Sequence, residues 1–515
     1  MKKCRLIALI LTVVMLASMV PMALAEADRP TLTVLMSVGG RQWVPTTSNN
    51  QKLMEVLGVN FDVECVDNET VIRRFAAGDL ADIITLNGFT FSEYADTGYL
   101  LPLNDLYAKY SEQRSLHTTQ YALDLCTING ELLALPYENN NVKYFTQIRK
   151  DWLDNLGYDY SGWEQIENTD IYTISLETYE QILSDFTFKD PDGDGEDNTY
   201  GLSYYGKADP ASSFMAFYGA FGGVMTQYYV VDGQMFAYET MPEYRQALEE
   251  LHKLWDEGVI DKEIYILAAD QAKANLMAGK SGSFNSWWST AFELIRDGMW
   301  DLQPTTTWMT ASIVGPEGKV GMKDNGRVTS TICITTQCAD PDLAMQVLDK
   351  IDSDECWWLI RYGVEGEHYT RKENGEYENR TEAGTELFSA LQMDCLYPLT
   401  NRIDIENEIN SIMPTDEKMI IRRNMAVHQF VTWAPLYSSA AYGLANPQEN
   451  MDFGVDVTNC VNKWNMEFVT GQTELNDANW EAYLKAWKAA GGSDILAAYV
   501  NEYNAKNGTS VTPGM

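Results

Sequence analysis

Alternating carboxylates in one short segment are the clearest chemical signal in the chain. Asp190, Asp192 and Asp194 occupy positions 1, 3 and 5 of DPDGDGEDNTYG, and Gly195 occupies position 6. Alternate residues of a tight loop can direct their oxygens at one centre, and a glycine permits the sharp turn, which suits Ca²⁺. The sequence therefore predicts a structural calcium site. An acidic Asp/Gly turn that holds no ion is the alternative.

The later positions of this segment refine the prediction. The carbonyl of Glu196 and the side chain of Asn198 continue the ligand set. Gly201 stands at position 12, where an EF-hand loop has a bidentate Glu. We therefore expect a calcium loop without that closing ligand.

Aromatic side chains cluster in segments of irregular sequence. Trp287 and Trp288 follow Phe284 in GKSGSFNSWWST, and Tyr204 and Trp433 belong to other such segments. Sugar rings have apolar C–H faces and polar rims, so aromatics flanked by Asn, Asp, Glu and Arg suit a carbohydrate. For any single ring, packing in the core is the competing interpretation.

Motifs of common catalytic chemistry are missing from the sequence. It contains no G-x-S-x-G, H-E-x-x-H or G-x-G-x-x-G motif, and its four histidines are far apart. A glycosidase needs only two carboxylates, and 74 acidic residues always offer a pair. The acids alone therefore do not indicate an enzyme, and we predict none.

Charge and length limit the remaining classes. The 515 residues include 37 Lys and Arg against 74 Asp and Glu, which gives a formal charge of −37. This charge disfavours nucleic acids and anionic membrane surfaces as partners. The length exceeds what one ordinary core supports, so two or more domains are expected.

The N-terminus has the features of a secretory signal. Basic residues precede an apolar run from Leu6 to Val20, and Ala23-Leu24-Ala25 has the form of a signal-peptidase site. We predict a signal peptide at residues 1–25, removed on secretion. An uncleaved membrane anchor is the alternative.

Strands and helices alternate after this signal. Strands are predicted at Leu32–Met36, Phe61–Val66 and Ala81–Leu86, with a helix at Glu69–Ala77, an order that implies a parallel sheet. Strand character returns at Val328–Thr335. Asp340 and Pro341 then have the types of an N-cap and a first helical residue, and the last hundred residues are mostly helical, with Ser493 predicted as an N-cap.

Several segments together resemble the family 1 extracellular solute-binding proteins of bacterial ABC importers, of the larger oligosaccharide-binding, lipoprotein-like type. The resemblance spans nearly the whole chain after the signal. The segments on which the resemblance rests are, in order, IRKDWLDNL (148–156), DPDGDGEDNTYG, EGVIDKE (257–263), GKSGSFNSWW, GPEGK (315–319), YGVEGEHY (362–369) and the tail FVTGQTELNDANWEAYLKAWKAAGG.

This resemblance implies an α/β, two-lobed periplasmic-binding-protein-like fold of class II with a helical C-terminal extension. Residues 26–145 and 311–375 would form the N-terminal lobe, and residues 146–310 and 376–515 the other. The calcium ligands it implies are Asp190, Asp192, Asp194, Glu196, Asn198 and Thr199. Asn198 departs from the Asp common at its position.

Ligand-binding candidates follow from placement near the expected cleft. Asn87 and Phe89 come just after the third strand, where open α/β sheets bind ligands. Tyr137, Glu138 and Asn139 precede the first crossing between lobes. The full set is Asn87, Phe89, Tyr137, Glu138, Asn139, Tyr204, Trp287, Trp288, Glu365, His368, Tyr369 and Trp433.

The predicted function is capture of a carbohydrate, with an oligosaccharide favoured, between the lobes and delivery to ABC permease subunits in the membrane. The protein would act as a monomer at the outer face of the cytoplasmic membrane, secreted or periplasmic, with no nucleic acid as a partner. A secreted carbohydrate-active enzyme and a binding protein for peptides or another polar solute are the alternatives.

Overall fold

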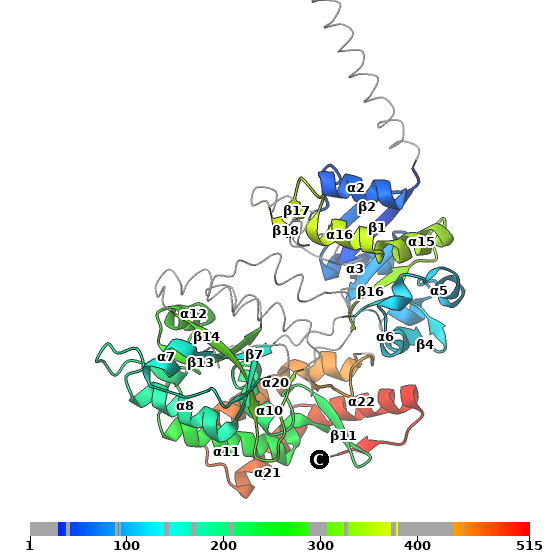
Figure 1. Ribbon diagram of the computed structural model, residues 1–515. Coiled ribbons are helices and arrows are strands. Elements are labelled where there is room, and N and C mark those ends of the chain that lie inside the picture. Colours follow the sequence, from blue (N-terminus) through cyan, green and yellow to red (C-terminus); the bar gives the residue numbers. More distant parts are fainter. Residues whose placement is uncertain are drawn as a thin grey trace, which may run out of the picture. The chain divides into compact units, whose positions relative to one another are not determined.

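Figure 1 shows the computed structural model, which divides into two compact units. One unit comprises Met1–Asn139 and Val328–Arg402, and the other Asn140–Arg327 and Ile403–Met515. The structure describes residues 29–37, 42–87, 91, 94–138, 144–165, 171–204, 210–287, 306–323, 328–371, 377–379, 436–444 and 446–514. The predicted signal peptide lies outside these residues.

The first unit is built on a five-stranded sheet of order β2-β1-β3-β16-β6. Its strands are β1 (Thr31–Ser37), β2 (Asn60–Val66), β3 (Ile83–Asn87), β6 (Leu135–Glu138) and β16 (Val328–Ile334). β1 pairs in parallel with β2 and β3, as the sequence predicts, whereas β16 is antiparallel to both β3 and β6. The strand that returns from the second unit thus lies inside this sheet.

Helices pack around this sheet, and their starts follow local capping rules. They are α2 (Ser48–Leu57), α3 (Asn68–Ala77), α5 (Asn104–Tyr110), α6 (Gln120–Leu125), α15 (Pro341–Ile351) and α16 (Asp354–Tyr362). Two short antiparallel strand pairs also belong to this unit: β4 (Thr127–Ile128) with β5 (Glu131–Leu132), and β17 (Tyr369–Arg371) with β18 (Tyr377–Asn379). The predicted cap of α15 is confirmed: the Asp340 carboxylate accepts a hydrogen bond from the Leu343 amide at 3.0 Å, and Pro341 is the first helical residue.

A buried ion pair joins distant segments of the first unit. Arg114 Nε lies 3.1 Å from Asp352 Oδ2, and both side chains are fully buried. Asp352 caps the C-terminus of α15, where the helix dipole disfavours a negative charge. The Arg114 guanidinium offsets that cost and fixes the segment before α6 against α15.

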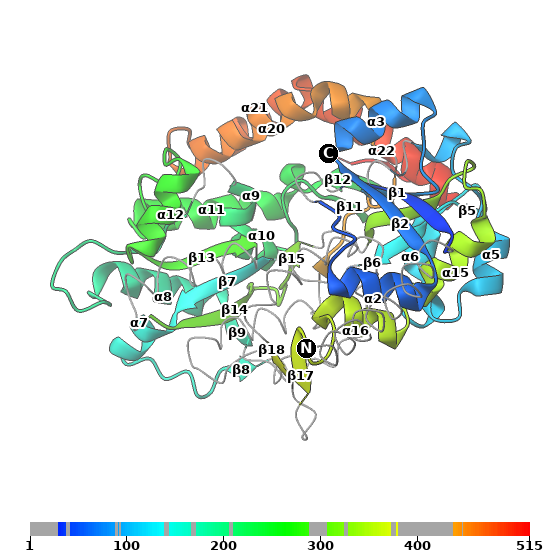
Figure 2. The same cartoon turned by 90° about the horizontal axis from the view of Figure 1, so that it is seen from above.

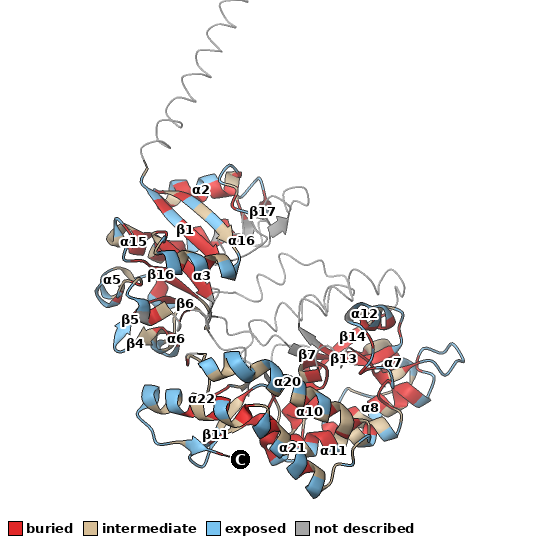
Figure 3. Ribbon diagram, turned by 180° about the vertical axis from the view of Figure 1, so that it is seen from behind, coloured by how far each residue is buried: buried red, intermediate tan, exposed pale blue. Residues whose placement is uncertain are grey.

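The second unit contains a six-stranded sheet of order β10-β13-β7-β14-β9-β8. Its strands are β7 (Tyr144–Arg149), β8 (Glu164–Gln165), β9 (Ile171–Ser175), β10 (Tyr200–Leu202), β13 (Ser281–Trp287) and β14 (Trp308–Val314). β7 enters from the first unit and runs antiparallel to its neighbours β13 and β14. Figure 3 shows that the buried residues follow these strands and the inner faces of the helices.

The remaining elements of the second unit are mostly helices. They are α7 (Lys150–Asn155), α8 (Leu176–Phe188), α9 (Pro210–Ser213), α10 (Met215–Ala220), α11 (Pro242–Asp256) and α12 (Ala269–Met277), followed by α20 (Gln448–Val469), α21 (Asp477–Ala489) and α22 (Gly492–Asn507). Strands β11 (Tyr228–Val231), β12 (Gln234–Ala237) and β20 (Thr512–Pro513) form a small sheet, and β15 (Met322–Lys323) pairs with β19 (Leu436–Tyr437). The predicted helical tail is confirmed.

The three tail helices pack against one another, and α20 also packs against α11 (Figure 2). A hydrogen bond from Arg245 of α11 to Asp477 joins α21 to the same helix. Gly491, rather than the predicted Ser493, is the N-cap of α22, because the helix already begins at Gly492. In the described part of the chain, no helix has both the length and the apolar character that a membrane crossing requires.

The boundaries between units differ from the predicted ones at the second crossing. The prediction returns the chain to the first lobe at residue 311, but the second unit extends to Arg327. The reason is β14, whose residues pair with β7 on one side and β9 on the other. A buried strand sequence does not reveal which sheet it joins. The first crossing lies at residues 139–140, close to the predicted 145–146, and the third, predicted at 375–376, lies at 402–403, outside the described residues.

The buried ion pair predicts a large stability difference between two carboxylate-to-amide substitutions. Asp352→Asn removes the buried carboxylate that faces the Arg114 guanidinium, so we expect the first unit to lose about 3–5 kcal/mol. Glu55→Gln is the control, because its partner Lys52 and Glu55 itself are exposed, and it should cost under about 1 kcal/mol. Urea unfolding followed by circular dichroism measures both, and equal losses would contradict the importance of the pair.

Candidate functional site

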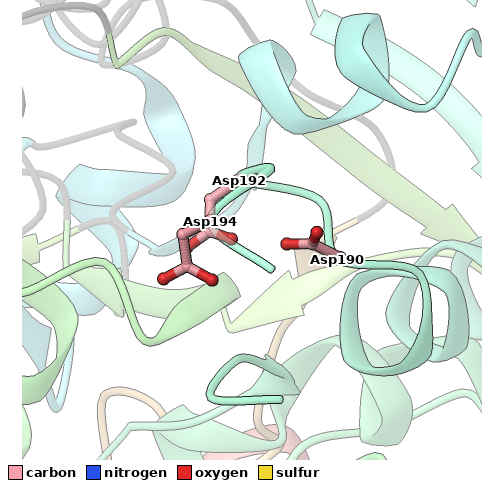
Figure 4. A group of neighbouring side chains, drawn as sticks. All are labelled: Asp190, Asp192 and Asp194. Atoms are coloured by element: carbon pink, nitrogen blue, oxygen red, sulfur yellow. The ribbon is translucent and has the colours of Figure 1, made fainter. Parts of the chain in front are cut away.

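The acidic loop that follows α8 brings three carboxylates together, as the sequence predicts. Oxygens of Asp190, Asp192 and Asp194 all lie within 4.8 Å of one another, and the three side chains are exposed (Figure 4). In the described residues this is the one group of three or more His, Cys, Asp or Glu side chains with that geometry. The arrangement fits a hard cation that takes oxygen ligands.

Backbone and amide donors hold the loop in this shape. The Gly195 amide donates to Asp190 Oδ2 at 3.1 Å, and the Glu196 amide donates to Asp194 Oδ1 at 2.8 Å. Asn198 Nδ2 donates to the other oxygen of Asp194 at 2.9 Å. The loop is therefore partly organised by its own hydrogen bonds.

The carboxylates of this loop repel one another. The pKa of Asp192 is raised, first because neighbouring protein atoms remove part of its hydration and then because of the negative charge of Asp194. A divalent cation at the centre of the three carboxylates would reverse this effect by favouring their ionised forms.

Two further members of the predicted ligand set differ in what they offer. Glu196 is exposed beside the cluster. The Thr199 hydroxyl instead donates to the Phe186 carbonyl at 2.8 Å, and Thr199 is 6% exposed. Its side chain is committed to the end of α8, which leaves only its carbonyl oxygen as a candidate ligand.

Predicted ligand residues of the first unit meet at one end of its sheet. Asn87 on β3 and Tyr137 on β6 both lie opposite Ser330 of β16, so the three form one row across the sheet. Glu138 is the next residue of β6. Phe89 and Asn139 lie outside the described residues.

The predicted residues of the segment after α16 separate into an exposed and a buried group. Glu365 is exposed, whereas His368 and Tyr369 are 1% and 5% exposed. His368 Nδ1 accepts a hydrogen bond from the Val364 amide at 2.9 Å, which places the ring proton on Nε2. Nε2 is buried and has no hydrogen-bond partner in the described structure.

The predicted aromatic residues of the second unit are distributed differently. Trp287 is the last residue of β13, opposite Tyr144 of β7. Tyr204 is 1% exposed, and its ring packs on Phe284 with centroids 5.4 Å apart. This packing does not present the face of Tyr204 to a ligand. Trp288 and Trp433 lie outside the described residues.

A cavity of about 270 Å³ opens at the sheet edge of the second unit and was not predicted from the sequence. Tyr158, Tyr160, Trp163 and Tyr172 line it together with Asp159, Ser161 and Gln165. Three of the four aromatics lie in the run YDYSGW (158–163), which could have indicated the cavity. Its composition is also that of an ordinary loop, so the run alone does not predict a binding site.

A second unpredicted cavity, of about 330 Å³, lies between β11, β12 and the tail helices. Rings of Tyr228 and Tyr499, with centroids 4.8 Å apart, form part of its wall. The Glu239 carboxylate also lines it and is 6% exposed. The residues that enclose this cavity are spread over nearly 300 positions, which no local pattern reveals.

Comparison with known sequences places the chain beside bacterial binding proteins. No protein-family model matches it. Lipoprotein LipO of Bacillus subtilis (strain 168) is 24% identical over 490 residues, which cover 91% of this chain and 87% of LipO. The polygalacturonan/rhamnogalacturonan-binding protein YtcQ of the same strain is 21% identical over 458 residues, which cover 86% of this chain and 84% of YtcQ.

Solved structures with the same architecture are carbohydrate-binding proteins, two of them described as ABC-transporter solute- or substrate-binding proteins. An HMO-binding protein of this class from Bifidobacterium longum infantis has a TM-score of 0.64 at 17% identity, covering 93% of this chain and 99% of that one. An EF-hand mutant of FusA from S. pneumoniae, in complex with fructo-nystose, has a TM-score of 0.58 at 18% identity, with coverage of 93% and 99%. Alginate-binding protein AlgQ2, solved without calcium ion, has a TM-score of 0.58 at 17% identity, with coverage of 93% and 98%.

These matches confirm the predicted fold class. The chain has the two-lobed α/β fold of solute-binding proteins, with helices at its C-terminal end.

Two glycines of the segment after α16 provide a test of its packing. Gly363 and Gly366 have φ angles of +83° and +86°, so alanine is strained at either position, and the ψ of −150° at Gly363 adds to the strain there. A Cβ on Gly363 would also lie 2.6 Å from the His368 ring, whereas a Cβ on Gly366 would meet nothing within 4 Å. We expect Gly366→Ala to cost about 1–2 kcal/mol and Gly363→Ala about 1–3 kcal/mol more.

Thermal unfolding of the two variants measures this difference. If both alanines lowered the melting temperature equally, the close packing of His368 on Gly363 would be wrong.

Proposed function

We propose that the protein is the extracellular solute-binding component of an ABC importer and that it captures a carbohydrate between its two lobes. The observation that carries the proposal is a fold match over 93% of the chain to solute-binding proteins named as HMO-binding or solved with fructo-nystose. The name of YtcQ adds polysaccharide fragments to the candidate ligands. The loaded protein would then deliver the sugar to membrane permease subunits.

The proposed mechanism is closure of the lobes around the ligand. Closure removes the sugar from water, which strengthens its hydrogen bonds to the protein. Trp287, at the end of β13, would stack on the sugar together with Trp288. Asn87 and Tyr137, in one row of the first sheet, would contribute polar contacts.

Binding rather than turnover is the activity we propose. The relatives with informative names are binding proteins, and the proposal assigns no catalytic residue. A secreted carbohydrate-active enzyme would release shortened sugar from an oligosaccharide mixture, whereas a solute-binding protein returns it intact. A binding protein for peptides would be stabilised by peptides and by no sugar.

The proposed location is the outer face of the cytoplasmic membrane. The signal features of residues 1–25 and the similarity to a lipoprotein, LipO, support export. We propose that the exported protein works as a monomer, with one ligand for each chain.

We also propose that the acidic loop holds a structural Ca²⁺. Asp190, Asp192 and Asp194 would supply carboxylate oxygens, and Glu196, Asn198 and the carbonyl of Thr199 would complete the set. The names of two structural neighbours, one with an EF-hand and one solved without calcium ion, support a metal role for this region.

Sugar binding is tested by thermal shift across a panel of oligosaccharides and peptides. A ligand whose free concentration is a hundred times its dissociation constant should stabilise the protein by about 2.7 kcal/mol.

Trp287→Ala should weaken sugar binding about tenfold through the loss of stacking. Phe188→Ala is the control because this ring is 58% exposed on α8. Unchanged sugar affinity in both Trp287→Ala and Trp288→Ala would contradict the stacking proposal, and stabilisation by peptides alone would contradict the carbohydrate.

Calcium binding is tested with two charge-matched variants of one loop. In chelator, Asp192→Asn should not lower the melting temperature, because the pKa of Asp192 is raised and its charge is unfavourable in the ion-free fold. The same variant should lose the stabilisation that calcium confers, about 2.7 kcal/mol at a hundredfold excess over the dissociation constant. Asp197→Asn removes an equal charge outside the ligand set and should keep that stabilisation. No calcium-dependent shift in the thoroughly chelated wild type would refute the site.

A further inference from the structure

Four aromatic residues gather at the open edge of the sheet in the second unit, and we call them the edge patch. They are Tyr158, Tyr160, Trp163 and Tyr172. The first three lie in the segment between α7 and β8, and Tyr172 lies on β9 opposite Gln165 of the edge strand β8. A two-residue strand and a loop thus carry the patch at the end of the sheet.

Three rings of the edge patch hold one another in fixed orientations. Centroids of Tyr160 and Trp163 are 5.9 Å apart, and each lies 6.1 Å from the centroid of Tyr172. The ring planes meet at 54° to 80°. All are half-buried, so each ring packs partly on the core and partly faces outward. A ligand would meet preorganised rings, which lowers the entropic cost of binding.

Hydrogen bonds anchor the tyrosines from behind. The Tyr160 hydroxyl donates to Asp154 at 2.6 Å, and the Tyr158 hydroxyl donates to Asp185 at 2.8 Å. Lys150 forms an ion pair with Asp154 and lies over the Tyr160 ring, with its ammonium 5.1 Å from the centroid. These contacts orient the rings but leave the polar rim of the cavity free for other partners.

The rim of the cavity is polar. Asp159, Ser161 and Gln165 line it. The Ser161 hydroxyl and amide both donate to Asp159, which lowers the pKa of that carboxyl and keeps it ionised. The rim therefore offers a carboxylate and an amide around an aromatic floor.

This chemistry selects the class of ligand. Aromatic faces with a polar rim match a sugar ring, whose C–H face is apolar and whose edge carries hydroxyls. Asp159 disfavours an anion. A free cation would compete with Lys150, which already occupies the cation–π position over Tyr160. The volume of about 270 Å³ is below the usual range of about 300–1,000 Å³ for ligand pockets, so it suits one sugar residue.

The edge patch is separate from the predicted stacking residue of the same unit. Tyr172 lies on β9, and Trp287 lies on β13, with β7 and β14 between them. Neighbouring strands are about 4.8 Å apart, so three steps across the sheet separate the two positions by about 14 Å. One sugar ring cannot contact both.

We propose that the edge patch is a second carbohydrate site, which binds single sugar residues of a long chain outside the site of Trp287. The proposal rests on the proposed function, since it takes the ligand to be a carbohydrate. Two weak sites on one polysaccharide raise the effective concentration of sugar at the protein. The edge patch therefore retains polymeric glycan and contributes nothing to a short oligosaccharide.

Affinity electrophoresis of the full chain in native gels tests this proposal. The gels contain inulin or starch, which are uncharged, and a gel without polysaccharide corrects for mobility. Trp163→Ala should weaken retardation about fivefold in the gel that retards the wild type, while its affinity for a short oligosaccharide in calorimetry stays unchanged. Trp163→Phe retains a ring and should restore most of the retardation. Trp255→Ala is the matched control, because Trp255 is also a half-buried tryptophan of the second unit and lies outside the edge patch.

The variants separate failure of the second site from failure of the proposed function. Trp287→Ala should weaken oligosaccharide binding about tenfold but keep residual retardation through the edge patch. Full retardation of Trp163→Ala, or a loss equal to that of Trp255→Ala, would overturn the edge patch and leave the proposed function intact. If no polysaccharide retards the wild type, the edge patch is refuted, and the oligosaccharide titration decides the proposed function separately.

Discussion

Pairing between strands far apart in sequence is the constraint on which both units depend. β16 fills the position between β3 and β6, so the first sheet is incomplete until the chain has returned from the second unit. β7 likewise lies between β13 and β14, which follow it by more than a hundred residues. The first sheet therefore cannot form from one continuous part of the chain, whereas the second draws all its strands from residues 144–314. Completion of the first sheet thus requires the chain to pass through the second unit and return.

This constraint explains where the candidate binding residues lie. Asn87 and Tyr137 come from different strands and share one row only because β16 stands between them. Trp287 ends the strand that pairs with β7, close to the point where the chain enters the second unit. The acidic loop is of another kind, because its three carboxylates converge within five residues and depend on local backbone donors.

Sequence patterns predicted the local features well and the long-range ones less well. Asp340 with Pro341 identified a helix start, and alternating aspartates identified the acidic loop, because both depend on neighbouring residues. The residues of β14 have the pattern of a buried strand, but that pattern does not identify the sheet that the strand joins. The boundary of the second unit was therefore predicted too early in the chain. The burial of Tyr204 and the grouping of the edge-patch rings were not predicted, because burial of an aromatic depends on partners that sequence spacing does not identify, such as Phe284.

The account has one central claim, that the protein binds a carbohydrate without changing it. Isothermal titration with the oligosaccharide that gives the largest thermal shift, followed by mass spectrometry of the recovered ligand, tests this claim most directly. The account predicts saturable binding of one ligand per chain and recovery of the sugar at its original mass. Recovery of shortened sugar, or no heat with any carbohydrate of the panel, would contradict it.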